Sequence, residues 1–316
     1  MVTNNKVAVL MGGFSNERDI SLRSGEAIFK ALQRNNVNVI SFDPKFRRLS
    51  ELIDEKISKA FIALHGPFGE DGHVQGILEY FGIPFTGSGL VSSALAMDKI
   101  QAKRIFQSVG LKTPRFSILE DGEGSELDMN LDIFPAILKP NSEGSSLGVE
   151  KVEKLADLPI VRRKVAKFGE KMLLEKFIGG RELTCGVLHL SSAGTPHPLP
   201  IVEVIAPGGS YNFHNKYESK KTKYICPPKL PREIIKNIEE SSIKAFETLG
   251  CRHWARVDFI WDSRNEPEIL ELNTVPGMTE KSLVPMAAEK SGLTFDDLVL
   301  KILNNASLVN GFDHEY

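Results

Sequence analysis

The first hundred residues alternate short apolar runs with segments whose apolar residues recur at helical spacing. Apolar runs occupy residues 6–11 and 59–64, and amphipathic segments follow them around residues 27–32 and at 71–81. Apolar residues at i, i+3 and i+4 mark one face of a helix, whereas a short apolar run is typical of a buried strand. Strands that are joined by helices lie parallel in one sheet. We therefore predict a parallel α/β domain over residues 1–96.

The remaining chain lacks this regular alternation. A helix is expected at residues 97–109, and three strands follow at residues 135–139, 148–152 and 171–177. The loop NSEGSSLG joins the first two of these strands, so antiparallel pairing between them is expected. We predict a central α+β domain over residues 97–183 and a C-terminal α+β domain over residues 184–316.

Composition excludes several classes of protein. The 316 residues are 41% hydrophobic and 25% charged, which is typical of a globular chain and not of a disordered one. The formal net charge of -2 gives no basic excess that would attract nucleic acid or an anionic membrane. The three cysteines lack metal-type spacing, and neither a signal peptide nor a spanning segment is apparent. We expect a cytoplasmic protein without membrane insertion.

The last two expected strands carry paired oxygen-bearing side chains. RVDFIWD and EPEILELN flank the turn DSRN, which predicts a β-hairpin. Glu271 and Asn273 are two residues apart and share one face of a strand, and Asp258 lies across from them if the strands pair. Carboxylate and amide oxygens are the ligands that magnesium prefers. The alternative, solvated acids at a sheet edge, fits poorly with the apolar residues beside them, so we predict a metal site.

The loop NSEGSSLG has the composition of an anion-binding loop. Its glycines allow the backbone to approach an anion closely, and Ser145 and Ser146 supply hydroxyl groups. Lys139 ends the preceding strand and Lys99 begins the helix of the same domain, so both are candidates for binding phosphate. A flexible linker and two surface lysines are the alternative reading. The loop is neither a Walker A motif nor a dinucleotide fingerprint.

Eight strings, taken together, resemble the D-alanine–D-alanine ligase family. They run in the family's order over almost the whole chain: GGFSNERDIS, HGPFGEDGHVQG, TGSG followed by MDK, LKPNSEGSSLGV, LEKFIGGRELT, KYICPP, RVDF and ELNTVPGMTEKSLVP. The resemblance implies an ATP-grasp fold with an N-terminal Rossmann-like domain. It also implies ATP as a substrate, two magnesium ions with manganese as an alternative, and a homodimer.

The resemblance also implies which residues hold the nucleotide. Lys99, Lys139 and Ser146 would bind the phosphates, and the adenosine pocket would consist of Glu175, Lys176, Phe177, Ile178 and Glu182. Without the resemblance, Phe177 and Ile178 would be read as strand core. Lys216, in a polar loop that resembles the family's mobile lid, would reach the γ-phosphate. As an isolated loop this segment would be read as variable surface.

The substrate residues follow from the same resemblance. Glu17 would bind the ammonium group of the first D-alanine, with Ser145 and Tyr217 linked to it by hydrogen bonds, and His65 would lie nearby. Taken alone, Glu17 reads as a first-turn helix acid and His65 as a structural histidine. The second D-alanine would meet Arg256, Gly277, Ser282 and Leu283, with Arg256 and the Gly277 N–H facing the developing oxyanion. Val275 stands where some relatives have serine.

The expected activity is the ATP-dependent joining of two D-alanine molecules through an acyl phosphate, for peptidoglycan precursors. A D-alanine–D-serine or D-lactate ligase, or another ATP-grasp ligase, is the neighbouring alternative. A regulatory nucleotide-binding module without chemistry is a second alternative, and the complete set of expected site residues argues against it. A dinucleotide oxidoreductase is disfavoured because Gly12-Gly13 lacks the glycine spacing of that class.

Overall fold

The computed structural model describes residues 5–120, 132–190, 194–207 and 221–309. Its first sheet is parallel and has the strand order β2-β1-β3. The strands are β1 (Lys6–Leu10), β2 (Val39–Phe42) and β3 (Ile57–Ile62). The helices of this region are α1 (Arg18–Arg34), α2 (Glu51–Asp54), α3 (His73–Tyr80) and α4 (Leu90–Met97). The predicted parallel α/β unit is therefore confirmed at the start of the chain.

The second sheet is antiparallel and has the order β4-β7-β5-β6. Its strands are β4 (Phe116–Leu119), β5 (Ala136–Pro140), β6 (Glu150–Val152) and β7 (Met172–Lys176). α5 (Lys99–Ser108) precedes it, and α6 (Leu158–Val165) lies between two short 3-10 turns, Leu155–Asp157 and Ala166–Phe168. β5 and β6 pair antiparallel across the glycine- and serine-rich loop, as predicted.

The third sheet has the order β11-β10-β8-β12-β13, with β9 paired to β8. Its strands are β8 (Arg181–His189), β9 (His197–Pro198), β10 (Val202–Ile205), β11 (Lys223–Ile225), β12 (His253–Trp261) and β13 (Glu268–Asn273). Two helices belong to this region, α8 (Arg232–Thr248) and α9 (Leu283–Lys290). β12 and β13 form the predicted hairpin, in which Asp258 pairs with Glu271 and Arg256 with Asn273.

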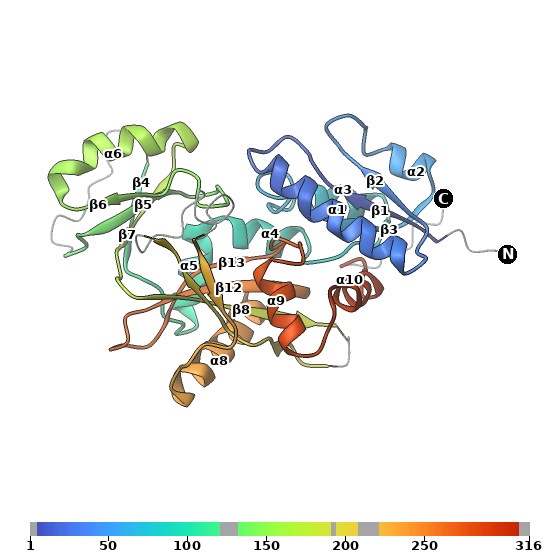
Figure 1. Cartoon of the computed structure of the whole chain (residues 1–316). Helices are drawn as coiled ribbons and strands as arrows, with labels where there is room; N and C mark the ends of the chain where they lie inside the picture. The colour runs from blue at the N-terminus through green and yellow to red at the C-terminus, as the bar shows by residue number, and fades with distance from the viewer. Residues whose placement is uncertain (1–4, 121–131, 191–193, 208–220, 310–316) are drawn as a thin grey trace.

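The last helix, α10 (Phe295–Asn304), returns to the N-terminal sheet, and Figure 1 shows it beside α1. A capping box begins the helix: Thr294 accepts a hydrogen bond from the backbone of Asp297, whose side chain accepts in return from the Thr294 backbone. Val299 and Ile302 on its buried face belong to the same hydrophobic core as β1 and α1. The first domain is thus covered by a segment almost 300 residues away in the chain.

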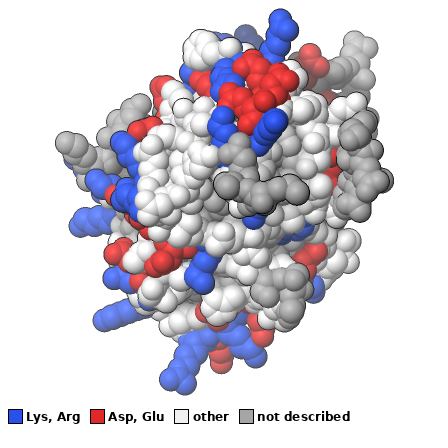
Figure 2. All heavy atoms as spheres, turned by 90° about the vertical axis from the view of Figure 1, so that its right-hand side faces the viewer, with Lys and Arg blue, Asp and Glu red and all other residues white. Residues whose placement is uncertain are grey.

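The surface carries charges of both signs. On the face shown in Figure 2, basic and acidic side chains are interspersed around a broad uncharged area. This distribution agrees with the small net charge of the chain. In the part of the chain that the structure describes, no helix combines the length and apolar character needed to cross a bilayer.

Candidate active site

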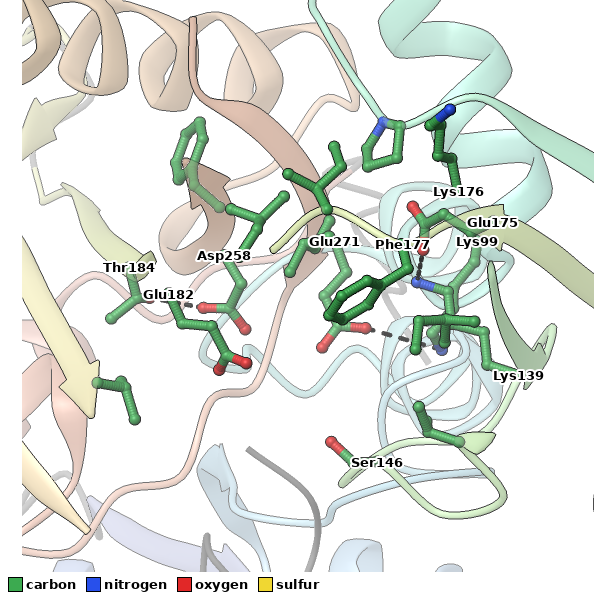
Figure 3. Close-up of a pocket in the computed structure, with 18 of the residues that line it drawn as sticks. Lys99, Lys139, Ser146, Glu175, Lys176, Phe177, Glu182, Thr184, Asp258 and Glu271 are labelled. Atoms are coloured by element: carbon green, nitrogen blue, oxygen red, sulfur yellow. Dashed lines mark hydrogen bonds and ion pairs between the residues drawn. The ribbon is translucent and has the colours of Figure 1, made fainter. Parts of the chain in front are cut away.

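A cavity of about 330 Å³ lies between the four-stranded and the six-stranded sheets, a volume within the usual range for small-molecule sites. Strands from both sheets supply its walls, as Figure 3 shows. Predicted residues that line it are Lys99, Lys139, Ser146, Glu175, Lys176, Phe177, Ile178, Glu182, Asp258, Glu271 and Leu283. Every nucleotide-binding residue predicted within the described part of the chain therefore faces one cavity.

One end of the cavity is rich in buried cationic groups. Lys99 is 8% exposed, and its Nζ donates a hydrogen bond of 2.6 Å to the backbone oxygen of Glu143. The same ammonium lies 3.9 Å from Glu271, while Lys139 lies 2.5 Å from Glu175. Burial lowers the pKa of Lys99, and the charge of Glu271 opposes that shift. These two lysines give this end the chemistry of a phosphate site.

The end of β7 and the residues that follow it form a further part of the cavity wall. The N–H groups of Lys176 and Phe177 already donate to the backbone oxygens of Arg115 and Pro135, at 2.8 and 2.9 Å. They are therefore not available to an adenine edge. The Phe177 ring lies at the wall, where the ammonium of Lys151 stands 4.3 Å from its centroid. An aromatic face beside a cation suits a flat π-system such as adenine.

The hairpin brings the three predicted metal ligands together. The Asp258 carboxylate accepts from Asn273 at 3.2 Å and from Thr184 at 2.6 Å, while Glu271 lies directly opposite on β13. Arg256 donates to both oxygens of Asp258, at 2.8 and 2.7 Å. Among the described residues, no group of three or more His, Cys, Asp or Glu side chains is suited to a metal. The predicted set instead combines two carboxylates with an amide, which are the oxygen ligands that magnesium accepts.

A second, smaller cavity lies beside the first. Its lining includes Glu17, His65, Ser145, Arg256 and Gly277 from the predicted substrate site. Glu17 is 4% exposed and its carboxylate accepts a hydrogen bond from Ser145. Two of the three domains expected from the sequence therefore meet at this carboxylate.

His65 is buried at the same place and has two side-chain partners. Its Nδ1 lies 3.1 Å from Glu70 and its Nε2 lies 3.1 Å from Ser24. Burial alone would lower the pKa of His65, but Glu70, with Glu17 nearby, raises it above its ordinary value. The ring therefore holds a proton more readily than a free histidine.

Ser282 and Leu283, predicted for the second substrate, are not among the residues that line the smaller cavity, although the Ser282 hydroxyl lies beside Gly277. Ser282 is the N-cap residue of α9, and its hydroxyl accepts from the backbone N–H of Thr279 at 3.0 Å. Leu283 lines the larger cavity. Lys216 and Tyr217 lie outside the described residues, so both remain predictions.

Three residues of the site were not singled out from the sequence. Thr184 donates a hydrogen bond to Asp258, and Glu70 lies within hydrogen-bond distance of His65. Lys103 donates to Glu175 from outside the cavity lining. Lys103 follows Lys99 by four residues, which places both side chains on one face of a helix. This spacing could have indicated that the two lysines of α5 face the same region. Glu70 lies within the string HGPFGEDGHVQG, but its partner becomes clear only from the fold.

Comparisons with known proteins agree on one family. Residues 105–304 match the family described as D-ala D-ala ligase C-terminus, and residues 45–88 match D-ala D-ala ligase N-terminus. A D-alanine–D-alanine ligase from Bordetella petrii is 44% identical over 96% of this chain and 92% of its own.

Solved structures give the same result. The D-alanine–D-alanine ligase from Bacillus anthracis complexed with ATP has a TM-score of 0.80 at 31% identity, covering 95% of this chain and 96% of that one. The VanG D-Ala:D-Ser ligase from Enterococcus faecalis has a TM-score of 0.82 at 28% identity, covering 96% and 99%. These likenesses confirm the predicted fold class, ATP-grasp with an N-terminal α/β domain.

Proposed function

The chain belongs to the D-alanine–D-alanine ligase family, and we propose on that premise that it joins two D-alanine molecules with conversion of ATP to ADP and phosphate. The product, D-alanyl-D-alanine, is the dipeptide of peptidoglycan precursors. One observation supports this proposal above the others. Glu271 lines both the larger and the smaller cavity, so a nucleotide in one and a small carboxylate in the other would share a wall.

The residues of the two cavities suit a two-step reaction. In the first step, a carboxylate oxygen of the first D-alanine attacks the γ-phosphorus of ATP, which forms D-alanyl phosphate and releases ADP. Lys99 and Lys139 hold the phosphates, and Glu17 with Ser145 holds the ammonium group of the substrate. Magnesium, when bound by Asp258, Glu271 and Asn273, neutralises phosphate charge.

In the second step, the amine of the second D-alanine attacks the acyl carbon. The tetrahedral intermediate carries a negative oxygen, which Arg256 and the Gly277 N–H would stabilise, and the fact that both residues line the smaller cavity supports this role. Collapse of the intermediate breaks the bond to phosphate and forms the amide, while the amine loses its proton.

One assay tests the proposal directly. The protein is incubated with ATP, magnesium and a panel of D-alanine, L-alanine, D-serine and D-lactate, and products are identified by mass alongside phosphate release. We expect phosphate release that depends on D-alanine and a product with the mass of D-alanyl-D-alanine. ATP cleavage that ignores D-alanine, or no cleavage at all, would contradict the proposal.

D-serine as the second substrate is a specific alternative, because the D-Ala:D-Ser ligase VanG is among the similar structures. Competition between D-alanine and D-serine in the same assay separates the two activities. A mixed dipeptide as the main product at equal concentrations would favour the alternative.

We also propose the larger organisation that the family suggests. The domains are residues 1–96, 97–183 and 184–316, the working form is a homodimer, and its dependence on ATP supports a cytoplasmic location. Light scattering on the purified chain measures the mass in solution, and a monomer at assay concentration would exclude the dimer as the working form.

A further inference from the structure

Lys103 on α5 is a fully buried cation that is not among the described residues lining the ATP cavity. Its side chain is 1% exposed. Its Nζ lies 2.5 Å from Thr113 Oγ1, 2.5 Å from Glu175 Oε1 and 3.4 Å from the backbone oxygen of Ile269. An ammonium has three N–H donors, and three acceptors surround this one. The geometry therefore suits the charged form.

Glu175 connects this buried lysine to the cavity. Its Oε1 faces Lys103 and its Oε2 lies 2.5 Å from Lys139, which lines the cavity, as Figure 3 shows for Glu175 and Lys139. Burial alone would raise the pKa of Glu175, but Lys103 and Lys139 together hold it below its ordinary value. Burial lowers the pKa of Lys103 to about 8, a shift that Glu175 opposes. Glu175 and Lys103 therefore form a charged pair at neutral pH.

The net charge of this cluster depends on Lys103. Glu175 and Lys139 alone would form a neutral pair, and the attraction of the carboxylate would compete with any phosphate for the Lys139 ammonium. With Lys103 behind it, the Glu175 carboxylate contacts two ammonium groups. Lys103, Glu175 and Lys139 together then carry one net positive charge beside the cavity. Charges interact more strongly where water is excluded, so this difference matters most at a buried site.

We propose that Lys103 is a positioning residue for ATP, which neutralises Glu175 from behind and so leaves the charge of Lys139 to the nucleotide phosphates. This inference rests on the proposed function of the cavity as an ATP site. A purely mechanical role is the competing explanation, because Lys103 and Thr113 also tie α5 to β13 through Ile269.

The test compares the dissociation constant for ATP, measured by calorimetry at fixed magnesium, in matched variants. Lys103→Met removes the charge, and Lys103→Gln does so with a polar side chain in case the first variant does not fold. Thr113→Val is the control, because it removes the hydroxyl that bonds to both Ile269 and Lys103 while every charged side chain stays in place. Thermal unfolding of each apo variant reports its stability separately.

We expect Lys103→Met and Lys103→Gln to weaken ATP binding by about tenfold, a coupling of ordinary size for contacting charges. Thr113→Val should stay within about twofold in ATP affinity even if it melts earlier. In a Glu175→Gln background, where the carboxylate charge is gone, Lys103→Met should change ATP affinity by no more than about twofold. The KM for D-alanine should not follow the change in ATP affinity.

Three results would overturn the inference. They are an unchanged ATP affinity in both Lys103 variants, an equal loss in Thr113→Val, or an equal loss in the Glu175→Gln background. Failure of the proposed function is recognised separately, because the unaltered protein would then bind no ATP in the same experiment.

Discussion

At the scale of single residues, the Asp258 carboxylate shows how many polar groups crowd the proposed metal site. Arg256, Thr184 and Asn273 all donate to its two oxygens. A metal ion binding here has to replace at least one of these contacts, whereas the Lys99 ammonium stands 3.9 Å from Glu271. Glu271 lines both cavities, so we choose it to test the proposed metal site.

Replacing Glu271 by Gln should lower turnover by about 100-fold at limiting magnesium, because a metal ion contributes several kcal/mol and each 1.36 kcal/mol is a factor of ten. Higher magnesium should recover part of the activity. The measurement is D-alanine-dependent phosphate release across a magnesium titration. Glu266→Gln is the control, since it removes an exposed carboxylate from the same hairpin. Nearly normal turnover of the Glu271 variant at low magnesium would argue against the ligand assignment.

The raised pKa of His65 should make the free energy of unfolding depend on pH. Its pKa in the folded protein lies above the ordinary value, so its contribution is complete below about 6.5 and is lost as pH rises through the folded pKa. Glu70→Gln removes the strongest of the groups that raise this pKa. In this variant the free energy of unfolding should therefore fall less steeply as pH rises. Denaturant unfolding at a series of pH values compares the two proteins. Identical pH slopes would show that Glu70 does not hold the proton on His65.

At the scale of elements, the loop between β5 and β6 serves both cavities. Ser145 and Ser146 are neighbours with positive φ values of 48° and 58°. Ser145 lines the smaller cavity and Ser146 the larger one. The strained backbone thus directs two adjacent hydroxyl groups to two different sites.

Replacing Gly144 in this loop should impair D-alanine binding more than ATP binding. A Cβ at this position would lie 2.3 Å from Glu17 Oε2, so Gly144→Ala has to push the loop or the carboxylate aside. We expect the KM for D-alanine to rise about tenfold or more, since a displacement near 1 Å can cost up to about a hundredfold. The dissociation constant for ATP should change less.

Steady-state kinetics with D-alanine and direct ATP binding separate these two effects. Gly110→Ala serves as a control for a glycine substitution, because its added Cβ meets nothing within 4 Å, although its positive φ adds strain. An equal loss of ATP affinity and D-alanine affinity in Gly144→Ala would mean that the whole loop had collapsed.

The elements also show how far the sequence alone leads. Strand periodicity and the short turn were sufficient to place Asp258 opposite Glu271, because a hairpin restricts which residues can pair. The contact of Lys103 with Glu175 joins residues 72 positions apart, and no local pattern specifies it. The amphipathic pattern of residues 295–304 predicts a buried face but not the surface that covers it. Packing across domains decides such contacts.

At the scale of the whole molecule, α10, near the end of the described chain, packs against the helix that follows the proposed substrate residue Glu17. Arg34 on α1 donates to Asp296 on α10 at 2.9 Å through Nε, and the buried faces of the two helices share one core. Glu17 directly precedes α1. The position of Glu17, the proposed partner of the D-alanine ammonium group, is therefore tied to a helix that lines neither cavity.

Ile302→Ala tests this dependence. Ile302 is fully buried in the core that includes β1 and α1, so its truncation should lower the free energy of unfolding by about 2–5 kcal/mol. Exposed Lys301→Ala should change it by no more than about 0.5 kcal/mol. Because one core joins α10 to the N-terminal sheet, hydrogen exchange should show the amides of β1 and β3 losing protection together with those of α10. Faster exchange confined to α10, with β1 and β3 unchanged, would mean that the first domain is stable without its C-terminal cover, and that Glu17 keeps its place independently of it.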